Sequence, residues 1–313
     1  MSAGDATTSA TTTATTTAAA RAAAAPPAGA RRPARRPRRR RRGPSAYAVL
    51  VGMAALAGIM LIPFVVVVFN ALKTPAEYTA NGPLAPPEGL YLGGMRDFWE
   101  RVGFGRVLFN SFLISASVAV GAVLLSVLNA YALGIGRVKG RMWVLVALLM
   151  ANTLPQEALV YPLFYLSKQV GLYDTRLGVI IVFTVIQSAF GTYLLSSVLS
   201  TFPRPLLEAA RIDGAGRWQI LWRVVVPVVR PTLSVLLVFF FIWTWNEFLI
   251  PLVFLQSNDN QTVSVALGVL HGQRLMDATM SSAAALLGLI PTVVFFLVFQ
   301  RTLSRGLTAG AIK

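Results

Sequence analysis

The chain has 313 residues, of which 55% are hydrophobic and only 13% charged, yet its formal net charge is +16. An average soluble domain carries about a quarter charged residues, so this composition excludes a chain disordered as a whole and favours an integral membrane protein. The absence of cysteine and the single histidine, His271, exclude disulfide scaffolds, thiol catalysis and metal sites built from thiolates or several histidines.

Residues 1–45 hold ten Arg and one Asp, and therefore +9 of the net charge. This segment runs from an Ala/Thr-rich stretch into an Arg/Pro block and cannot bury an apolar face, so we expect a disordered cytoplasmic tail. Because the block adjoins a long apolar segment, an anchor on anionic membrane lipid or a retention signal is favoured over a nucleic-acid contact. A cleaved signal peptide is disfavoured, since the apolar segment is longer than the core of a signal peptide.

Six apolar segments of membrane-spanning length follow: 46–72, 107–133, 142–166, 177–199, 232–255 and 281–303. Each reaches the roughly 20 residues that cross a hydrocarbon core as a helix, and each exceeds the about 10 residues of a barrel strand. The predicted fold is all-α, a polytopic membrane protein with six transmembrane helices in one domain, 46–313. Prolines inside the segments predict kinks or breaks, namely Pro63, Pro155, Pro251 and Pro291.

The fourth segment carries small hydroxyl residues at a spacing of four, namely Ser188, Thr192, Ser196 and Ser200. On a helix this spacing places them in one line. We therefore expect a face for close helix packing, with no catalytic role.

Basic residues orient the segments, because the cytoplasmic side of a membrane protein is enriched in Lys and Arg. If the N-terminus is cytoplasmic, the tail and the inner loops 134–141, 201–231 and 301–313 hold 21 of the 28 basic residues. The outer loops 73–106, 167–176 and 256–280 hold seven basic and seven acidic residues. The sequence therefore predicts a multi-pass protein of the cytoplasmic (inner) membrane with both termini in the cytoplasm.

The chain contains no motif that binds or hydrolyses a nucleotide. A phosphate-binding G-x-x-x-x-G-K-[ST] loop does not occur in it. The glycines of 134–140 have the wrong spacing for a dinucleotide fingerprint and join two spans, so they are interpreted as a tight basic loop. His271 is interpreted as a solvated loop residue. No enzyme activity and no cofactor of the chain's own are expected.

The long inner loop, 201–231, is predicted to form a helix, a glycine turn and a second helix. Pro203 and Pro205 favour a helix start, and Gly214 supplies a left-handed end. A second helix is expected over 217–226, and Pro227 is expected to break the chain before the fifth span.

The first of these two helices is predicted to have distinct sides. One side carries Leu206, Ala209, Ala210 and Asp213, whereas Glu208 and Arg211 fall on another. The small alanines would let the backbone of a partner approach closely. The alternative is an amphipathic helix that lies on lipid, which Trp218 and Trp222 would suit.

This loop resembles the EAA loop of ABC importer permeases, whose pattern is EAA-x3-G-x9-I-x-L-P. The matching residues are Glu208-Ala209-Ala210, Gly214 and Val224-Val225-Val226-Pro227, with Val in place of Ile and Leu. Further pieces resemble the carbohydrate (maltose-type) branch, in the partner that lacks a large periplasmic domain: Asn110-Ser111, the EAARIDG of 208–214, Trp245-Asn246-Glu247-Phe248, and Gln300-Arg301 with 306–313.

The resemblance implies a permease subunit of a binding-protein-dependent importer. Its implied partners are a second permease, two ATPase subunits that bind the ATP, an extracytoplasmic solute-binding protein and a carbohydrate. In the family, the EAA helix docks in a groove of an ATPase subunit, and closure of the ATPase pair switches the permease. The residues that carry over to this coupling role are Glu208, Ala209, Ala210, Asp213, Gly214 and Pro227, and the segment 306–313 is expected to reach towards the ATPase pair.

Two carboxylates inside predicted spans mark a candidate substrate path. Glu157 and Glu247 each lie about 22 Å from the inner end of a straight helix at 1.5 Å per residue. Such residues face protein or water because a charge in hydrocarbon costs several kcal/mol. Asn152, Gln156 and Asn246 add amides suited to sugar hydroxyls. Alternatively, Glu247 ties two helices together.

Two other function classes stay open from the sequence. One is a proton-coupled secondary transporter that uses the two glutamates, for which we find no internal repeat. The other is a membrane scaffold held by the tail. The solute class also stays open between a sugar, a polyol and a glycerophosphate-type compound. Asn258, Asp259 and Asn260, in the outer loop 256–280, are a candidate contact for a binding protein.

Overall fold

The computed structural model describes residues 44–136, 138–272 and 277–309, and throughout these ranges the regular structure is helical. The elements before the third predicted span are α2 (Pro44–Ala71), α3 (Pro75–Asn81), α4 (Gly93–Val102), α5 (Phe104–Ala130) and the wide π-helical turn η1 (Tyr131–Ile135). The chain divides into two compact units, Met1–Ile59 and Met60–Lys313. The boundary falls within α2, and the second unit carries all the sites discussed below.

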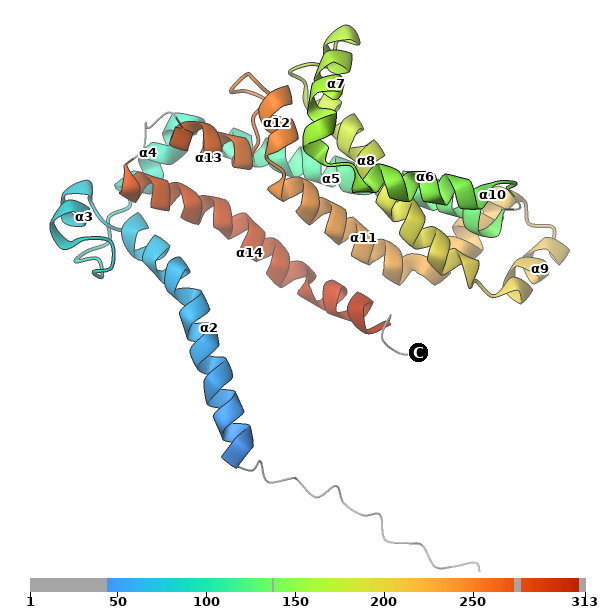
Figure 1. Cartoon of the computed structure of the whole chain (residues 1–313), viewed down its shortest axis with the longest axis horizontal. Helices are drawn as coiled ribbons and strands as arrows, with labels where there is room; N and C mark the ends of the chain where they lie inside the picture. The colour runs from blue at the N-terminus through green and yellow to red at the C-terminus, as the bar shows by residue number, and fades with distance from the viewer. Residues whose placement is uncertain (1–43, 137, 273–276, 310–313) are drawn as a thin grey trace, which may run out of the picture. The chain divides into compact units, whose positions relative to one another are not determined.

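The remaining helices all belong to the second unit (Figure 1). They are α6 (Arg141–Thr153), α7 (Gln156–Gln169), α8 (Arg176–Ser200), α9 (Arg204–Ile212), α10 (Arg217–Ile220), the π-helical turn η2 (Leu221–Val225), α11 (Val226–Asn246), α12 (Leu249–Phe254), α13 (Val263–Gly272) and α14 (Ala278–Ala309).

In the part of the chain that the structure describes, five helices are long and apolar enough to cross a membrane. They are Tyr47–Ala71, Phe104–Ile135, Arg176–Ser200, Arg217–Asn246 and Ala278–Arg301. A sixth span is present if α6 and α7, which are bent by 97° at a short break, count as one. The all-α, polytopic prediction is confirmed. The tail, 1–43, lies outside the described residues.

The third predicted span is a broken helix rather than a straight one. Leu154 and Pro155 have extended backbone between α6 and α7, and Figure 1 shows the sharp change of direction there. Pro155 lacks an N–H and its ring disfavours a helical conformation for Leu154, so the helix ends at Thr153. The break that this proline predicted is therefore present.

The fifth span begins earlier than predicted, because Pro227 does not break the chain. The helix runs from Arg217 through Asn246, and η2 directly precedes the proline. In this wide turn the Val226 N–H reaches back to the Leu221 carbonyl. A π-turn re-registers the helix around a residue that lacks an N–H donor. The predicted second loop helix thus forms one continuous element with the span.

The core of the second unit forms where α5 packs closely against α8 and α11. The predicted line of hydroxyl residues on α8 lies in this contact: Ser188, Thr192 and Ser196 are buried, whereas Ser200 is exposed. Ser126 of α5 donates its hydroxyl to the Ala122 and Ser188 carbonyls at 2.6 and 3.2 Å. Small side chains therefore bring the two helices close together, as the spacing predicted.

Aromatic and amide contacts attach α11 to its neighbours. The Phe241 ring lies 4.3 Å from the Phe295 ring of α14 between centroids, and Trp245 lies 5.3 Å from the same ring. Gln187 of α8 donates 2.8 Å to the Thr244 hydroxyl of α11, and both residues are buried. The span α11, which continues from the inner loop, therefore contacts both α14 and α8.

Gly191 offers a test of the close contact between α5 and α8. A Cβ at Gly191 would lie 2.2 Å from the Ser126 hydroxyl and 2.9 Å from the Phe240 ring. We expect Gly191→Val to lower the free energy of unfolding by about 1–3 kcal/mol, because overpacking shifts both helices. Thermal unfolding of the purified protein in detergent measures this loss.

The matched control is Gly105→Val on α5, where the nearest atom would lie 3.8 Å from the new Cβ. Equal melting temperatures for the two variants would contradict the close packing.

Candidate functional site

The first helix of the inner loop, α9, ends in a complete glycine C-cap. Gly214 has a left-handed φ of +79°. Its N–H donates to the Arg211 carbonyl at 3.0 Å, and the Ala215 N–H donates to the Ala210 carbonyl at 2.9 Å. These two bonds are the Schellman pattern, which satisfies the last carbonyls of a helix. The left-handed end predicted at Gly214 is therefore present.

The faces of α9 differ from the prediction at one alanine. Leu207 is buried, and Ala210 packs against the main core, so Ala210 faces inward because it follows the buried leucine by three residues on the helix. Leu206, Ala209 and Asp213 remain exposed. Next to them, the Ile212 side chain is 86% exposed, which the sequence did not single out. The open face is thus more apolar than predicted.

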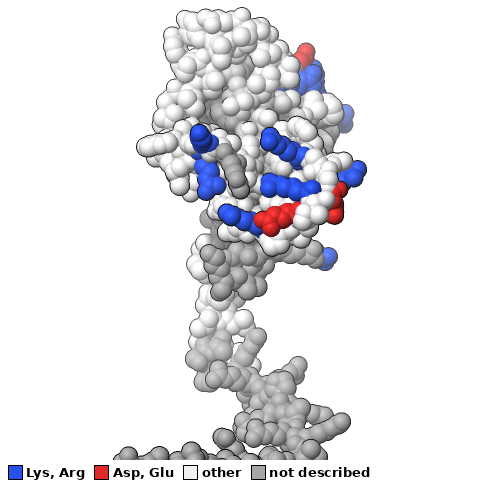
Figure 2. Space-filling view, turned by 90° about the vertical axis from the view of Figure 1, so that its right-hand side faces the viewer, with Lys and Arg blue, Asp and Glu red and all other residues white. Residues whose placement is uncertain are grey.

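A third face of α9 borders an open hollow of about 450 Å³. Arg204, Glu208 and Arg211 line it from α9, Lys139 lines it from the loop that precedes α6, and Arg141 lines it from the first turn of α6. Figure 2 shows Lys and Arg side chains gathered at this end of the second unit, with acidic side chains beside them. Glu208 thus faces a basic hollow, on a different side of α9 from Ala209.

The second half of the loop is tied to the second span. The Tyr131 hydroxyl of η1 donates to the Arg217 carbonyl at 3.1 Å, and the Gly216 N–H donates to the Gln219 side chain at 2.9 Å. From Arg217 onward, α10, η2 and α11 follow one another without interruption.

The candidate substrate-path residues all lie at helix breaks. Gln156 and Glu157 form the first turn of α7, directly after its break from α6. Asn246 is the last residue of α11, and Glu247 follows it with extended backbone before α12. The helices that follow these two breaks, α7 and α12, contact each other. The depth derived for Glu157 from a straight helix is corrected, because the chain turns by 97° just before it.

The amides of this group have partners within their own helices. Asn152 donates 2.9 Å to the Leu148 carbonyl, and Asn246 donates 2.7 Å to the Ile242 carbonyl. Each of these two amides keeps its second N–H and its carbonyl oxygen for other partners. The charged groups at the two breaks are the carboxylates of Glu157 and Glu247.

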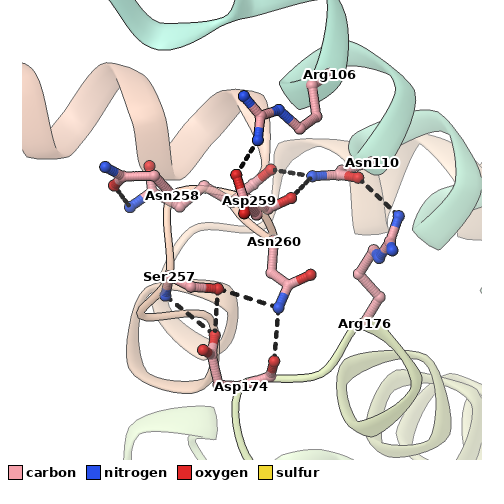
Figure 3. A network of polar contacts seen from close by, with 9 residues as sticks. Arg106, Asn110, Asp174, Arg176, Ser257, Asn258, Asp259 and Asn260 are labelled. Atoms are coloured by element: carbon pink, nitrogen blue, oxygen red, sulfur yellow. Dashed lines mark hydrogen bonds and ion pairs between the residues drawn. The ribbon is translucent and has the colours of Figure 1, made fainter.

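A polar network joins the start of α5 to the loop before α8 and the loop after α12 (Figure 3). Asn110, which is fully buried, donates to the Asp259 and Gln261 carbonyls at 2.8 and 3.1 Å. Arg176 of α8 donates to the Asn110 oxygen at 3.1 Å. Ser111 accepts the Val263 N–H at 2.8 Å, so the Asn-Ser pair fixes the start of α13.

The network continues through Asp174, a non-glycine residue with a φ of +55°. Its carboxylate accepts the N–H and the hydroxyl of Ser257, both at 3.1 Å, and its carbonyl accepts from Asn260 at 2.6 Å. Arg106 forms an ion pair with Asp259 at the rim. The predicted outer residues 258–260 thus belong to a structured loop. Sequence reasoning missed Asp174, Arg176 and Ser257, whose only signal was their polarity beside predicted spans.

Two predictions concern residues that the structure does not describe fully. The side chain of His271 and those of 306–313 lie outside the described residues. No group of three or more His, Cys, Asp or Glu side chains that could hold a metal is found among those that are described.

Comparison with known proteins identifies relatives along most of the chain. Residues 122–308 match the family described as "Binding-protein-dependent transport system inner membrane component". The chain is 32% identical to the inner membrane ABC transporter permease protein YcjP of Escherichia coli, over 84% of this chain and 94% of that one. It is also 32% identical to the sulfoquinovosyl glycerol transport system permease protein SmoH of Agrobacterium fabrum, over 81% and 89%.

A solved structure shares the fold. It is a bacterial ABC transporter involved in the import of the acidic polysaccharide alginate, with a TM-score of 0.63 and 24% identity. The alignment covers 82% of this chain and 95% of that one. This likeness concerns the arrangement of the helices.

The outer network predicts the effect of Asn110→Leu. The substitution leaves the Arg176 guanidinium and two loop carbonyls without their buried partner, a loss of about 1–3 kcal/mol. We expect amide hydrogen exchange over 257–261 to become roughly tenfold faster. Mass spectrometry of the exchanged protein in detergent measures this rate.

Asn258→Leu is the control, because Asn258 lies in the same loop and its side-chain oxygen accepts a bond from the Gln261 side chain within that loop. Unchanged exchange in Asn110→Leu would show that the network does not hold the loop.

Proposed function

The chain belongs to the family of binding-protein-dependent transport system inner membrane components, and we propose that it is a permease subunit of an ABC importer for a carbohydrate. The observation that carries this proposal is the pairing of family membership with α9, an exposed helix with a glycine cap at the EAA spacing. As a transport component, the chain is a membrane-integral protein rather than an enzyme.

The printed names of several relatives support a carbohydrate. They are the melibiose/raffinose/stachyose permease of Bacillus subtilis, the trehalose permease of Mycobacterium tuberculosis and the arabinooligosaccharides permease of Halalkalibacterium halodurans. One relative in Synechocystis is named for osmoprotective compounds. These similarities favour binding-protein-dependent import over the proton-coupled alternative.

The family implies three kinds of partner: another permease, ATPase subunits and a solute-binding protein. We propose that α9 is the element that docks on the ATPase, through the open face of Leu206, Ala209 and Ile212 with Asp213 at its end. Glu208 and Gly214 then act differently, Glu208 as a polar contact at the edge and Gly214 as the turn that holds α9 in place. ATP itself is bound by the partner subunits.

Coupling to transport follows from the continuity of the chain behind α9. From Arg217 the helix runs 30 residues to Asn246, about 45 Å at 1.5 Å per residue. Its far end is the break that carries Glu247, beside Glu157. A movement imposed on the loop is thus delivered to the candidate substrate path, where Asn152, Gln156, Glu157, Asn246 and Glu247 are the proposed polar lining.

The proposed orientation places α9 and both termini in the cytoplasm, with the domain 46–313 in the inner membrane and the tail 1–45 inside. The distribution of basic residues supports it. The polar network at the start of α5 and the loop at its end are separated by more than 20 residues of helix, which is about 30 Å or more. This separation supports the proposal that they lie on opposite sides of a bilayer.

Val substitutions at two neighbouring glycines test the coupling role. Gly214 requires a left-handed backbone, which costs a β-branched residue at least about 1–2 kcal/mol, so Gly214→Val distorts the end of α9. We expect ATP-driven uptake in proteoliposomes that contain the complete complex to fall at least tenfold, while membrane insertion persists.

Gly216→Val is the control. Its φ of −69° and ψ of 165° suit valine, and its nearest neighbour would lie 3.8 Å from the new Cβ, so uptake is expected to stay within about twofold of the unmodified complex. Normal uptake by the complex with Gly214→Val would contradict the coupling role of α9.

The topology can be tested with single cysteines, because the sequence contains none. In right-side-out vesicles we expect a membrane-impermeant maleimide to label Asn258→Cys, in the outer loop, without permeabilisation. Ile212→Cys, on α9, is expected to react only after the membrane is opened. The reverse pattern would contradict the orientation.

A further inference from the structure

The basic hollow beside α9 continues into a second hollow along the membrane helices. This groove, of about 390 Å³, runs between α6 and α8. Gly134, Arg141 and Ser200 line both hollows, so the two spaces meet at these residues. The composite site therefore has a charged end beside the loop and an apolar end along the helices.

The charged end carries four cations: Lys139, Arg141, Arg204 and Arg211. No ion pair or hydrogen bond involves their side chains within the described ranges 44–136, 138–272 and 277–309. The one carboxylate on the same wall is Glu208, which leaves a positive balance. The first turn of α6, which starts at Arg141, has no side-chain cap, and such free N–H groups add to the attraction for an anion.

The apolar end suits a hydrocarbon chain. From α6 it is lined by Met142, Leu145, Val146 and Leu149. From α8 it is lined by Tyr193 and by three small residues, Ser196, Ser197 and Ser200. Trp143, beside Arg141, is 78% exposed, and exposed tryptophan is typical of the depth of the lipid headgroups.

We propose that this composite site binds one anionic glycerophospholipid of the inner leaflet. Its phosphate lies among the four cations, and one acyl chain lies in the groove between α6 and α8. A soluble phosphate would satisfy the charged end alone, whereas a lipid accounts for both ends and for their junction at Arg141. The inference rests on the proposed orientation, in which α9 is cytoplasmic.

The position of the site gives the lipid a role in coupling. One wall of the charged end is α9 itself, and the opposite wall is the loop before α6. A bound phosphate attracts Arg204 and Arg211 towards Lys139 and Arg141. It thereby braces α9 on the side away from its open face, which stays free for the ATPase.

The test uses the purified full-length chain, stripped of lipid and titrated with phosphatidylglycerol or phosphatidylcholine in native mass spectrometry. Phosphatidylglycerol is expected to bind more tightly, as one retained molecule. In the double variant K139Q/R141Q its affinity is expected to fall roughly 30-fold, the loss expected when two cations near an anionic headgroup are removed. Equal affinity for both lipids, or no change in the variant, would overturn the proposal.

The matched control is R223Q/R230Q, which removes the same charge from exposed inner-loop positions outside both hollows. Its affinity for phosphatidylglycerol is expected to stay within threefold of the unmodified chain. Because the Arg-rich tail is present in both variants, its non-specific attraction for lipid cancels. If the control loses as much affinity for phosphatidylglycerol, the effect is general surface electrostatics, and the proposed site is wrong.

Two further variants test the acyl groove. Ser197→Phe fills it from α8, while Val198→Phe adds the same ring at the adjacent, exposed position outside it. Phosphatidylglycerol binding is expected to weaken only in Ser197→Phe. If glycerol phosphate competes as well as the lipid does, or if Ser197→Phe has no effect, the ligand is a soluble phosphate and the lipid proposal fails.

The assembled complex separates this inference from the proposed function. We expect the complex with its ATPase to retain the lipid. Release of the lipid on assembly would mean that the ATPase occupies the charged end, and would overturn the proposal. Uptake is measured separately. A complex that binds the lipid but does not import solute contradicts only the transport role. A complex that imports solute without binding the lipid contradicts only the lipid site.

Discussion

Hydrocarbon offers no hydrogen-bond partner to a peptide group, and this constraint governs where the helices of this chain can stop. Inside the apolar segments that the structure describes, α6 ends at Thr153 and α11 ends at Asn246. Each ending frees backbone groups, and each is surrounded by amide and carboxylate side chains. A break of this kind is tolerated only where protein or water meets it. Both breaks therefore carry polar groups that face protein or water, with Glu157 in the first turn of α7 and Glu247 between α11 and α12.

Two features connect the helix breaks with the inner loop. One is the close packing of α5 against α8, and the other is the unbroken helix that runs from the loop to Asn246. The contact of α5 with α8 depends on Gly191 and on small hydroxyl residues, which leave little room for independent sliding. The helix from Arg217 to Asn246, by contrast, links the loop to the break without a hinge other than η2. Under the proposed coupling, the close-packed pair of α5 and α8 stays in place while the continuous helix carries a movement of α9 towards Glu247.

Local chemistry made part of this structure predictable. The apolar segments specify the spans by length alone, and Gly214 specifies a helix end because only glycine takes that backbone readily. Pro155 was a correct signal of a break, but the angle depends on how α7 packs against α12, which no local pattern encodes. Pro227 was the wrong signal, because η2 absorbs the proline within a helix. The outer network joins residues 149 positions apart, Asn110 and Asp259, and such pairing leaves no periodic trace in a sequence.

The outer network also constrains how the helices that it joins can move. Asn110, Asp174 and Ser257 tie the outer ends of α5, α8 and the segment after α12 into a single bonded joint. A structure clamped at one end and driven at the other rotates about the clamp. Under the proposed coupling, we therefore expect displacements to grow with distance from Asn110 and to be largest at the loop 201–231.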